Sequence, residues 1–339
     1  MNTRDKNYWI EQAKDRLLEQ EKRADKGVSE LFFLYEEAAA EIETEIQAMF
    51  GKYAKDNQLT YEEAARLLSG KEHSVWKKSI EEYIGDASKA AKDSRAMMEL
   101  NTLAMKSRIS RKEQLLANIY QTMIQLAEDE NIKLKDLLED TLKVNYYEGC
   151  FRIQHGFGIG FNVAKIDDSL VRHILEYPWS EKHFSEAIWG HADHIASVAR
   201  GQISLGFVKG SSVQEMTKNI RHVMDTGKYV TERLVRTECK YFANQGELAS
   251  YKENGIAKYR FIGGSEGSTG SCGCADLNRN VFRVEDAEAG VNFPPIHPNC
   301  LCTVIAVFEK SLFDAKKGVN PLNENIRFSE WKKKYAQGA

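Results

Sequence analysis

The chain has 339 residues, 42% of them hydrophobic, and its 47 basic and 50 acidic side chains give a net charge of -3. This length can form one large domain or two to three ordinary ones, so we expect at least two modules. No run approaches the roughly 20 apolar residues of a membrane-spanning helix, and Asp5 and Glu11 lie where a secretory signal would be basic and then apolar. The small net charge supplies no global field that would gather nucleic acid, so any DNA contact must be local. A cytoplasmic protein of several modules is expected.

The first half of the chain has the pattern of long helices. All five prolines lie at or after Pro178, and proline breaks helix interiors because it lacks an N–H donor and clashes with the preceding turn. Between Tyr8 and Val144, apolar residues recur at intervals of three and four, as amphipathic helices require. The sequence therefore predicts a helical arm or bundle over residues 1–155, whose apolar stripes are packing faces and not a cofactor site. Breaks in the helices are expected near Asp25–Val28, Asn57–Thr60, Ser69–His73 and Asn131–Lys133.

Residues 156–225 are predicted to form a helical linker region that leads into a C-terminal module. Three glycines in HGFGIGF, at positions 156, 158 and 160, interrupt the helical pattern and predict a hinge or a loop that closes against a neighbour. They do not match GxGxxG, which argues against a dinucleotide site. We expect helices near Asp168–Tyr177, Ser180–Phe207 and Ser212–Met224, then a long helix from about Tyr229 to Glu253 that Gly255 ends.

Short strands are expected beyond this helix. KYRFI, NVFRV and CTVIAVF are β-branched and aromatic runs separated by glycine, asparagine and proline, and they predict a small α+β module over residues 226–308. The basic tail, residues 309–339, includes RFSEWKKKY, which we interpret as a short helix docked through Phe328 and Trp331; an extension that contacts a partner or DNA is the alternative. The predicted fold class is mainly α: a long helical N-terminal region followed by a small α+β C-terminal module with short strands and a Cys/His-rich turn.

Four motifs follow one another in the C-terminal third of the chain. They are an Arg-Thr-Glu helix in LVRTECKYFANQ, a Gly-Ile-x-Lys-Tyr strand in GIAKYRFI, a cysteine turn in SCGCADLNRNVF, and the final segment GVNFPPIHPNCLC. In this order they resemble the Mu F-like family of phage head-morphogenesis proteins, which are minor head or minor capsid proteins. Tyr8–Trp9 and FSEAIWG at Phe184–Gly190 resemble segments of a subgroup from tailed phages of Gram-positive hosts. The resemblance is dense over about Trp179–Cys302 and only architectural before it.

The resemblance implies a structural role in the virion. Members of the family associate in few copies with the portal vertex inside the procapsid, enter the mature head and affect DNA packaging or delivery. The implied partners are the portal protein and capsid or scaffold proteins; contact with phage DNA is left open, and no membrane is implied. The implied location is the inside of the virion head, with the host cytoplasm during assembly. The resemblance implies no enzymatic activity and requires no cofactor.

The distribution of cysteines is typical of a metal site. Cys150 and Cys239 are isolated, whereas the other four cysteines form two close pairs near the C-terminus. A structural zinc ion takes four thiolate or imidazole ligands, usually delivered as two close pairs on turns. Such an ion would tie together a small module that buries little apolar surface. The candidate ligands are Cys272, Cys274, His297, Cys300 and Cys302.

The cysteine turn differs from the family pattern at three positions. Ser271 stands where the first cysteine of a Cys-x-x-Cys pair is usual, Arg279 replaces a glycine, and Leu301 replaces an arginine. The Cys-x-Cys spacing is also less common in zinc sites than a spacing with two intervening residues. These departures favour reduced, buried cysteines that pack as small apolar groups over a zinc site, and a disulfide formed after virion release is a lesser alternative.

Further residues belong to the structural motif that the resemblance marks. We interpret Arg236 and Glu238 as a buried or half-buried polar clamp on the proline-rich turn, with simple solvent exposure as the alternative. The prolines predict a rigid, extended turn that presents His297 and Cys300, because proline fixes its own φ and restricts the residue before it. The motif residues are Arg236, Thr237, Glu238, Pro294, Pro295 and Asn299.

A small zinc-dependent or nucleotide-handling phage enzyme built on the Cys/His cluster is the alternative function, because such clusters also hold catalytic zinc. A nucleobase deaminase would need HxE upstream of P-C-x-x-C, and the chain has neither. His191 and His194 in HADHIA lack the HExxH spacing of zinc proteases. No catalytic residue is predicted.

Overall fold

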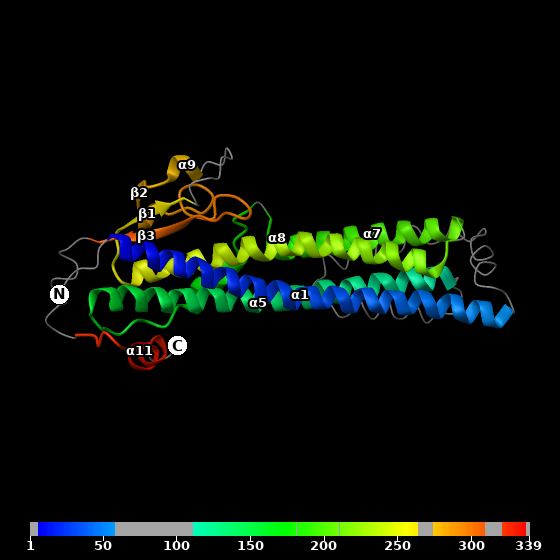
Figure 1. The fold of residues 1–339 in the computed structure, drawn as a ribbon, viewed down its shortest axis with the longest axis horizontal. Helices are drawn as coiled ribbons and strands as arrows, with labels where there is room; N and C mark the ends of the chain where they lie inside the picture. Colours follow the sequence, from blue (N-terminus) through cyan, green and yellow to red (C-terminus); the bar gives the residue numbers. More distant parts are fainter. Residues whose placement is uncertain are drawn as a thin grey trace. The chain divides into compact units, whose positions relative to one another are not determined.

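The computed structural model describes residues 6–57, 111–180, 182–209, 211–263, 274–308 and 321–336. The chain divides into two compact units. The first, here called the sheet unit, comprises Met1–Val28, Leu134–His183 and Arg233–Ala339; the second, the bundle unit, comprises Ser29–Lys133 and Phe184–Glu232. Three long helices, α1 (Lys6–Asn57), α5 (Arg111–Phe157) and α8 (Val213–Glu253), each contribute one end to each unit (Figure 1). Within the described ranges, no helix is both long and apolar enough to cross a membrane.

These helices are longer than the sequence predicts. The breaks expected near residues 25–28 and 131–133 are wrong, because α1 and α5 run through them. Gly27 is a packing position: a Cβ there would lie 2.3 Å from Cδ2 of Leu137. Asn131 satisfies its amide inside the helix by donating to the carbonyl oxygen of Ala127 at 2.8 Å. The residues expected to break the helix near 58–60 and 69–73 lie outside the described residues.

The described residues of the bundle unit form helices and the turns between them. It contains α7 (Phe184–Lys209) with the segments of α1, α5 and α8 that belong to it, and the two helices expected near 212–224 and 229–253 are the single helix α8. A buried polar group lies among its apolar side chains: Tyr35 donates to Glu130 at 3.2 Å, and Thr231 donates to the same carboxylate at 2.9 Å. Burial raises the pKa of Glu130 to about 7, although these two hydrogen bonds oppose the shift.

In the sheet unit, the glycine-rich segment ends α5. Gly158 adopts a φ of +67°, and its carbonyl oxygen accepts a hydrogen bond from Leu322 at 2.9 Å. A Cβ on Gly160 would lie 2.4 Å from the hydroxyl oxygen of Tyr335. The predicted loop that closes against a neighbour is confirmed, and the neighbour is the C-terminal segment. The short helix α6 (Asp168–Glu176) follows this loop.

The C-terminal helix α11 (Phe328–Tyr335) docks as the sequence predicts. Trp331 is fully buried, and its Nε1 donates to Oε1 of Gln154 at 2.9 Å. The rings of Phe328 and Trp331 each lie 5.6 Å from that of Phe151 on α5. The docking interpretation of the tail is confirmed for this segment, while residues 309–320 lie outside the described residues.

The predicted strands form a three-stranded antiparallel sheet in the order β2-β1-β3. The strands are β1 (Lys258–Ile262), β2 (Val281–Arg283) and β3 (Thr303–Val307), with α9 (Cys274–Leu277) before β2 and a single 3-10 turn, Val284–Asp286, after it. Tyr259 and Phe261 share the buried face of β1, as the two-residue period of a strand requires. Their register partners, Ala306 and Val304, are buried as well. The predicted mainly α fold with a small α+β C-terminal module is therefore confirmed.

A buried ion cluster joins the sheet to the helices. Arg16 on α1 forms an ion pair with Glu247 on α8, and both side chains are at most 5% exposed. The same guanidinium donates to the carbonyl oxygen of Val304 on β3 at 2.8 Å and to the hydroxyl of Thr303. Arg152 on α5 pairs with the other oxygen of Glu247 at 2.9 Å. Figure 1 accordingly shows β3 beside the beginning of α1.

Candidate metal centre

The cysteines gather at one end of the sheet. Strand β1 is antiparallel to both neighbours, so the end of β1 lies beside the beginnings of β2 and β3. Cys274 precedes β2, and Cys302 immediately precedes Thr303, the residue that pairs with Ile262 at the end of β1. The fold thus brings together cysteines that lie 26 residues apart in the sequence.

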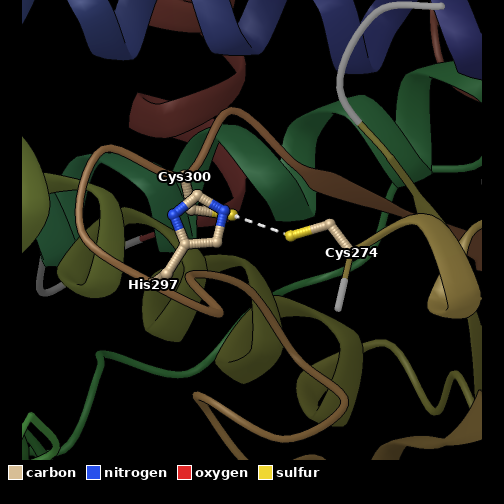
Figure 2. A group of neighbouring side chains, drawn as sticks. All are labelled: Cys274, His297 and Cys300. Atoms are coloured by element: carbon tan, nitrogen blue, oxygen red, sulfur yellow. Dashed lines mark hydrogen bonds between the residues drawn. The ribbon is translucent and has the colours of Figure 1, made fainter. Parts of the chain in front are cut away.

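Three potential ligands meet at this place. Cys274, His297 and Cys300, here called the Cys/His trio, have ligand atoms that all lie within 4.8 Å of one another. The Sγ atoms of Cys274 and Cys300 are 3.9 Å apart. Figure 2 shows the imidazole of His297 lying against the thiol of Cys300, with the thiol of Cys274 pointing toward them from its own segment. Both cysteines are buried, and His297 is half-buried.

A tight turn holds two members of the trio. The backbone N–H of Cys300 donates to the carbonyl oxygen of His297 at 3.2 Å. Asn299 adopts a φ of +58°, a left-handed conformation that asparagine tolerates better than most residues. Its N–H donates to the hydroxyl of Thr237 on α8 at 3.3 Å, and that hydroxyl donates to the carbonyl oxygen of Arg233 at 2.7 Å. Thr237 of the Arg-Thr-Glu motif therefore attaches the turn to the helix.

The other two motif residues on α8 have different partners. Arg236 pairs with Asp25 on α1 at 2.7 Å, with both side chains at least one-third exposed. Glu238 is buried and accepts a hydrogen bond from Nε1 of Trp179 at 3.0 Å. Burial raises the pKa of Glu238 to about 7, although this hydrogen bond favours the charged form. Arg236 is thus half-buried and Glu238 is buried, the observed contact to the turn runs through Thr237, and the clamp of Arg236 and Glu238 on that turn stays a prediction.

The proline-rich segment before the turn is buried. Pro294 and Pro295 are both buried and are joined by a cis peptide bond. The carbonyl oxygen of Pro295 accepts a hydrogen bond from the N–H of Gly290 at 2.9 Å, which closes a local loop. This loop leads directly into the turn that carries His297 and Cys300.

The surroundings of the trio are apolar on one side and cationic on another. Cys274, Cys300 and Cys302 pack with Phe261 of β1 in one buried cluster. A hydrogen bond from Cys302 is the main reason that the pKa of the Cys300 thiol lies below its usual value, and an electrostatic interaction with His297 acts in the same direction. Lys240 on α8 is buried and interacts electrostatically with Cys300 and Cys302. Burial lowers the pKa of Lys240 to about 8.

The five ligand candidates from the sequence do not all meet. Cys272 lies outside the described residues, and Cys302 lies beside Cys300 but outside the trio. Among the described residues, the trio is the group of three or more His, Cys, Asp or Glu side chains with metal-ligand spacing. The sequence pattern did not identify Lys240 as a neighbour of the cysteines. The sequence feature that could have indicated it is its position in the motif helix directly after Cys239. The zinc assignment itself stays a prediction.

The comparison with known families supports the sequence motifs. Residues 199–305 match the model of the family described as Phage Mu protein F like protein. The match begins within α7 and ends within β3, so it includes α8, β1, β2 and the whole Cys/His trio. No curated protein and no solved structure matches the chain significantly. The chain therefore carries, over residues 199–305, a segment of the Mu F-like family of phage head proteins, as the order of its motifs predicts.

Proposed function

We propose that this chain is a minor head protein of a tailed phage or prophage that acts in head morphogenesis. In this role it associates with the portal vertex inside the procapsid, enters the virion head and is needed for DNA packaging or delivery. The observation that carries the proposal is the match of residues 199–305 to the Mu F-like family. The proposed partners are the portal protein and capsid or scaffold proteins, met in the host cytoplasm during assembly.

The architecture supports a role in binding other proteins. Long helices contribute to both units, and the sheet unit takes its core from both ends of the chain. The thiols of Cys274 and Cys300 are buried at 4% and 3% exposure, so they are poorly placed to meet a substrate. A buried Cys/His group of this kind suits a role in holding the fold together.

The proposal is tested in the phage or prophage that encodes the chain. A strain that lacks the gene is complemented with a tagged copy, and procapsids and virions are purified on gradients. We expect the tagged chain to co-sediment with portal protein in both particles, and the strain without it to yield heads that are empty or that fail to deliver DNA. The chain found only as a free species, separate from procapsids and virions, would refute the proposal.

Two variants serve as controls for this experiment. Lys14→Met removes a solvent-exposed ion pair with Glu11 and should complement fully, because exposed pairs contribute little to stability. Arg16→Met removes a buried ion pair two residues further along the same helix and should complement less well, because lower stability reduces the abundance of folded protein in the cell. Deletion of the helical N-terminal region is a poor test, because α1 and α5 both contribute to the core of the sheet unit.

A further inference from the structure

The Cys/His trio has the spacing of a tetrahedral zinc site. Two thiolates that each lie about 2.3 Å from a tetrahedrally coordinated zinc ion are about 3.8 Å from one another. The Sγ atoms of Cys274 and Cys300 are 3.9 Å apart. All ligand atoms of the trio lie within 4.8 Å of one another, so one ion can reach all three after small adjustments. The spacing therefore fits zinc without a rearrangement of the backbone.

The imidazole of His297 is prepared to act as a ligand. Its Nδ1 lies 2.8 Å from the carbonyl oxygen of Pro298. A carbonyl oxygen can only accept, so Nδ1 carries the proton in this hydrogen bond, and in the neutral ring Nε2 is the nitrogen whose lone pair can bind a metal. A backbone carbonyl that fixes the tautomer in this way is the usual outer partner of a metal-binding histidine.

A fourth ligand and a compensating charge lie next to the trio. The thiol of Cys302 is hydrogen-bonded to that of Cys300 and is buried in the same cluster. Three thiolates and one neutral imidazole around a divalent zinc ion leave a net charge of about -1, which is costly to bury alone. The buried ammonium of Lys240 interacts with both of these thiols and would balance that charge.

We propose that the sheet unit binds one structural zinc ion through the Cys/His trio, with Cys302 as the fourth ligand. The ion ties the segment before β2 to the turn before β3, and Thr237 holds that turn on α8. Such a tie compensates for a sheet whose strands have only three to five residues. The inference does not rest on the head role, because a bound ion is detected in the isolated chain.

The test uses the full chain, purified under reducing conditions without added chelator. We expect about one zinc ion per chain by elemental analysis, and a lower melting temperature after treatment with a strong chelator. Cobalt substitution should give the visible absorption of a tetrahedral site with thiolate ligands. Cys274→Ser, Cys300→Ser and Cys302→Ser should each weaken zinc binding by more than about tenfold in competition with a chelator, since the loss of even an outer partner of a ligand weakens metal binding about 10- to 100-fold.

Matched variants separate ligand loss from misfolding. Cys239→Ser alters a cysteine that is also buried at 3% exposure in the sheet unit but lies outside the cluster, so it should retain the metal. His297→Cys should bind zinc through four thiolates, whereas His297→Ala should not bind it stoichiometrically. The contrast in zinc binding between His297→Cys and His297→Ala keeps the test decisive even if a serine variant fails to fold.

Three results would overturn the proposal. The first is wild-type chain with far less than one zinc ion, no uptake of cobalt and a melting temperature that chelator leaves unchanged. The second is full metal content in the Cys274→Ser and Cys300→Ser variants. The third is retention of zinc by Cys302→Ser, which would reject the fourth ligand. Loss of reactive thiols without a metal would instead indicate a disulfide between two sulfurs that lie 3.9 Å apart.

Discussion

Replacement of Arg16 by methionine should destabilise the sheet unit by about 3–4 kcal/mol. The guanidinium is 3% exposed and pairs with Glu247, which is 5% exposed, so the substitution leaves a buried carboxylate with one cation fewer. Breaking such a buried pair costs about 3–5 kcal/mol, and the remaining partner, Arg152, keeps the cost near the lower end. The carbonyl oxygen of Val304 loses a donor as well, at a cost of about 1 kcal/mol or more.

Urea unfolding followed by tryptophan fluorescence measures this loss. Three of the five tryptophans, Trp9, Trp179 and Trp331, lie in the sheet unit, so the larger share of the signal comes from that unit. With a urea dependence of about 2 kcal/mol per molar, the midpoint should fall by about 1.5 M in Arg16→Met. The matched variant Lys14→Met, on the same helix but in a pair that is more than 60% exposed, should shift it by less than about 0.3 M.

The pH dependence gives a second check on the same reasoning. Burial alone would raise the pKa of Glu247, but Arg16 and then Arg152 reverse this effect, and the net pKa lies below its usual value. The carboxylate therefore contributes stability above the pKa of the unfolded state, and this contribution is lost as the pH falls through the folded-state pKa. In Arg16→Met the pKa should rise, so the difference in stability between variant and wild type should shrink as the pH falls from about 7 to about 4. Equal midpoints for the two variants at neutral pH, or a difference that grows on acidification, would refute the assigned role of Arg16.

Further predictions concern buried acids and backbone geometry. Burial raises the pKa of Glu238 to about 7, from about 4.5 in the unfolded state. The protonated carboxyl therefore contributes its full stability below about pH 4.5, and this contribution is lost as the pH rises through about 7. Glu238→Gln should therefore stabilise the chain by about 2–3 kcal/mol at about pH 8 and change little at about pH 5, as urea unfolding at the two pH values will show. Arg279 has a φ of +70°, so Arg279→Gly should raise the unfolding free energy by about 1 kcal/mol in thermal melts. Gly290→Ala, at a φ of +84° with open space around it, should lower it by about 1 kcal/mol. Gly246→Ala should destabilise the chain by more than about 2 kcal/mol, because a Cβ there would lie 2.4 Å from a backbone carbonyl oxygen of α5. Gly190→Ala, in open space on α7, should stabilise the chain by up to about 1 kcal/mol. Unfolding followed by circular dichroism measures both effects.

Three outcomes would contradict this reasoning. A Glu238→Gln variant with the same stability difference from wild type at both pH values would show that the buried carboxyl does not take up a proton on folding. A destabilised Arg279→Gly variant would mean that its side chain contributes more than the left-handed backbone costs. Similar effects at Gly246 and Gly190 would show that the close approach of α8 to α5 is not tight enough to exclude a methyl group.

The sequence by itself determined the helical character of the described parts of the first half, the three strands and the resemblance of the C-terminal third to the Mu F-like family. These properties depend on local patterns: apolar spacing of three and four, the placement of all prolines at or after Pro178, and short β-branched runs beyond Gly255. The order of the C-terminal motifs is also a property of the sequence alone, and the family match over residues 199–305 agrees with it. The position of Arg279 is an instructive case, because the sequence shows an arginine in place of the usual glycine and the structure shows the positive φ that favours glycine there.

Only the tertiary structure decided which buried groups meet. Helix α1 continues past Gly27, and a glycine is needed there because Leu137, on another helix, occupies the space that a Cβ would need. Arg16 contacts Glu247 and β3, which lie more than 200 residues away in the sequence, and Thr237 on α8 accepts a hydrogen bond from the turn. Periodicity and turn propensity act over a few residues, whereas the partner of a buried charge is set by segments that packing brings together from distant parts of the chain. The same holds for the metal ligands. The sequence predicts four cysteines and His297 as candidates, and the antiparallel register of β1 with β2 and β3 brings Cys274, His297 and Cys300 together at one end of the sheet.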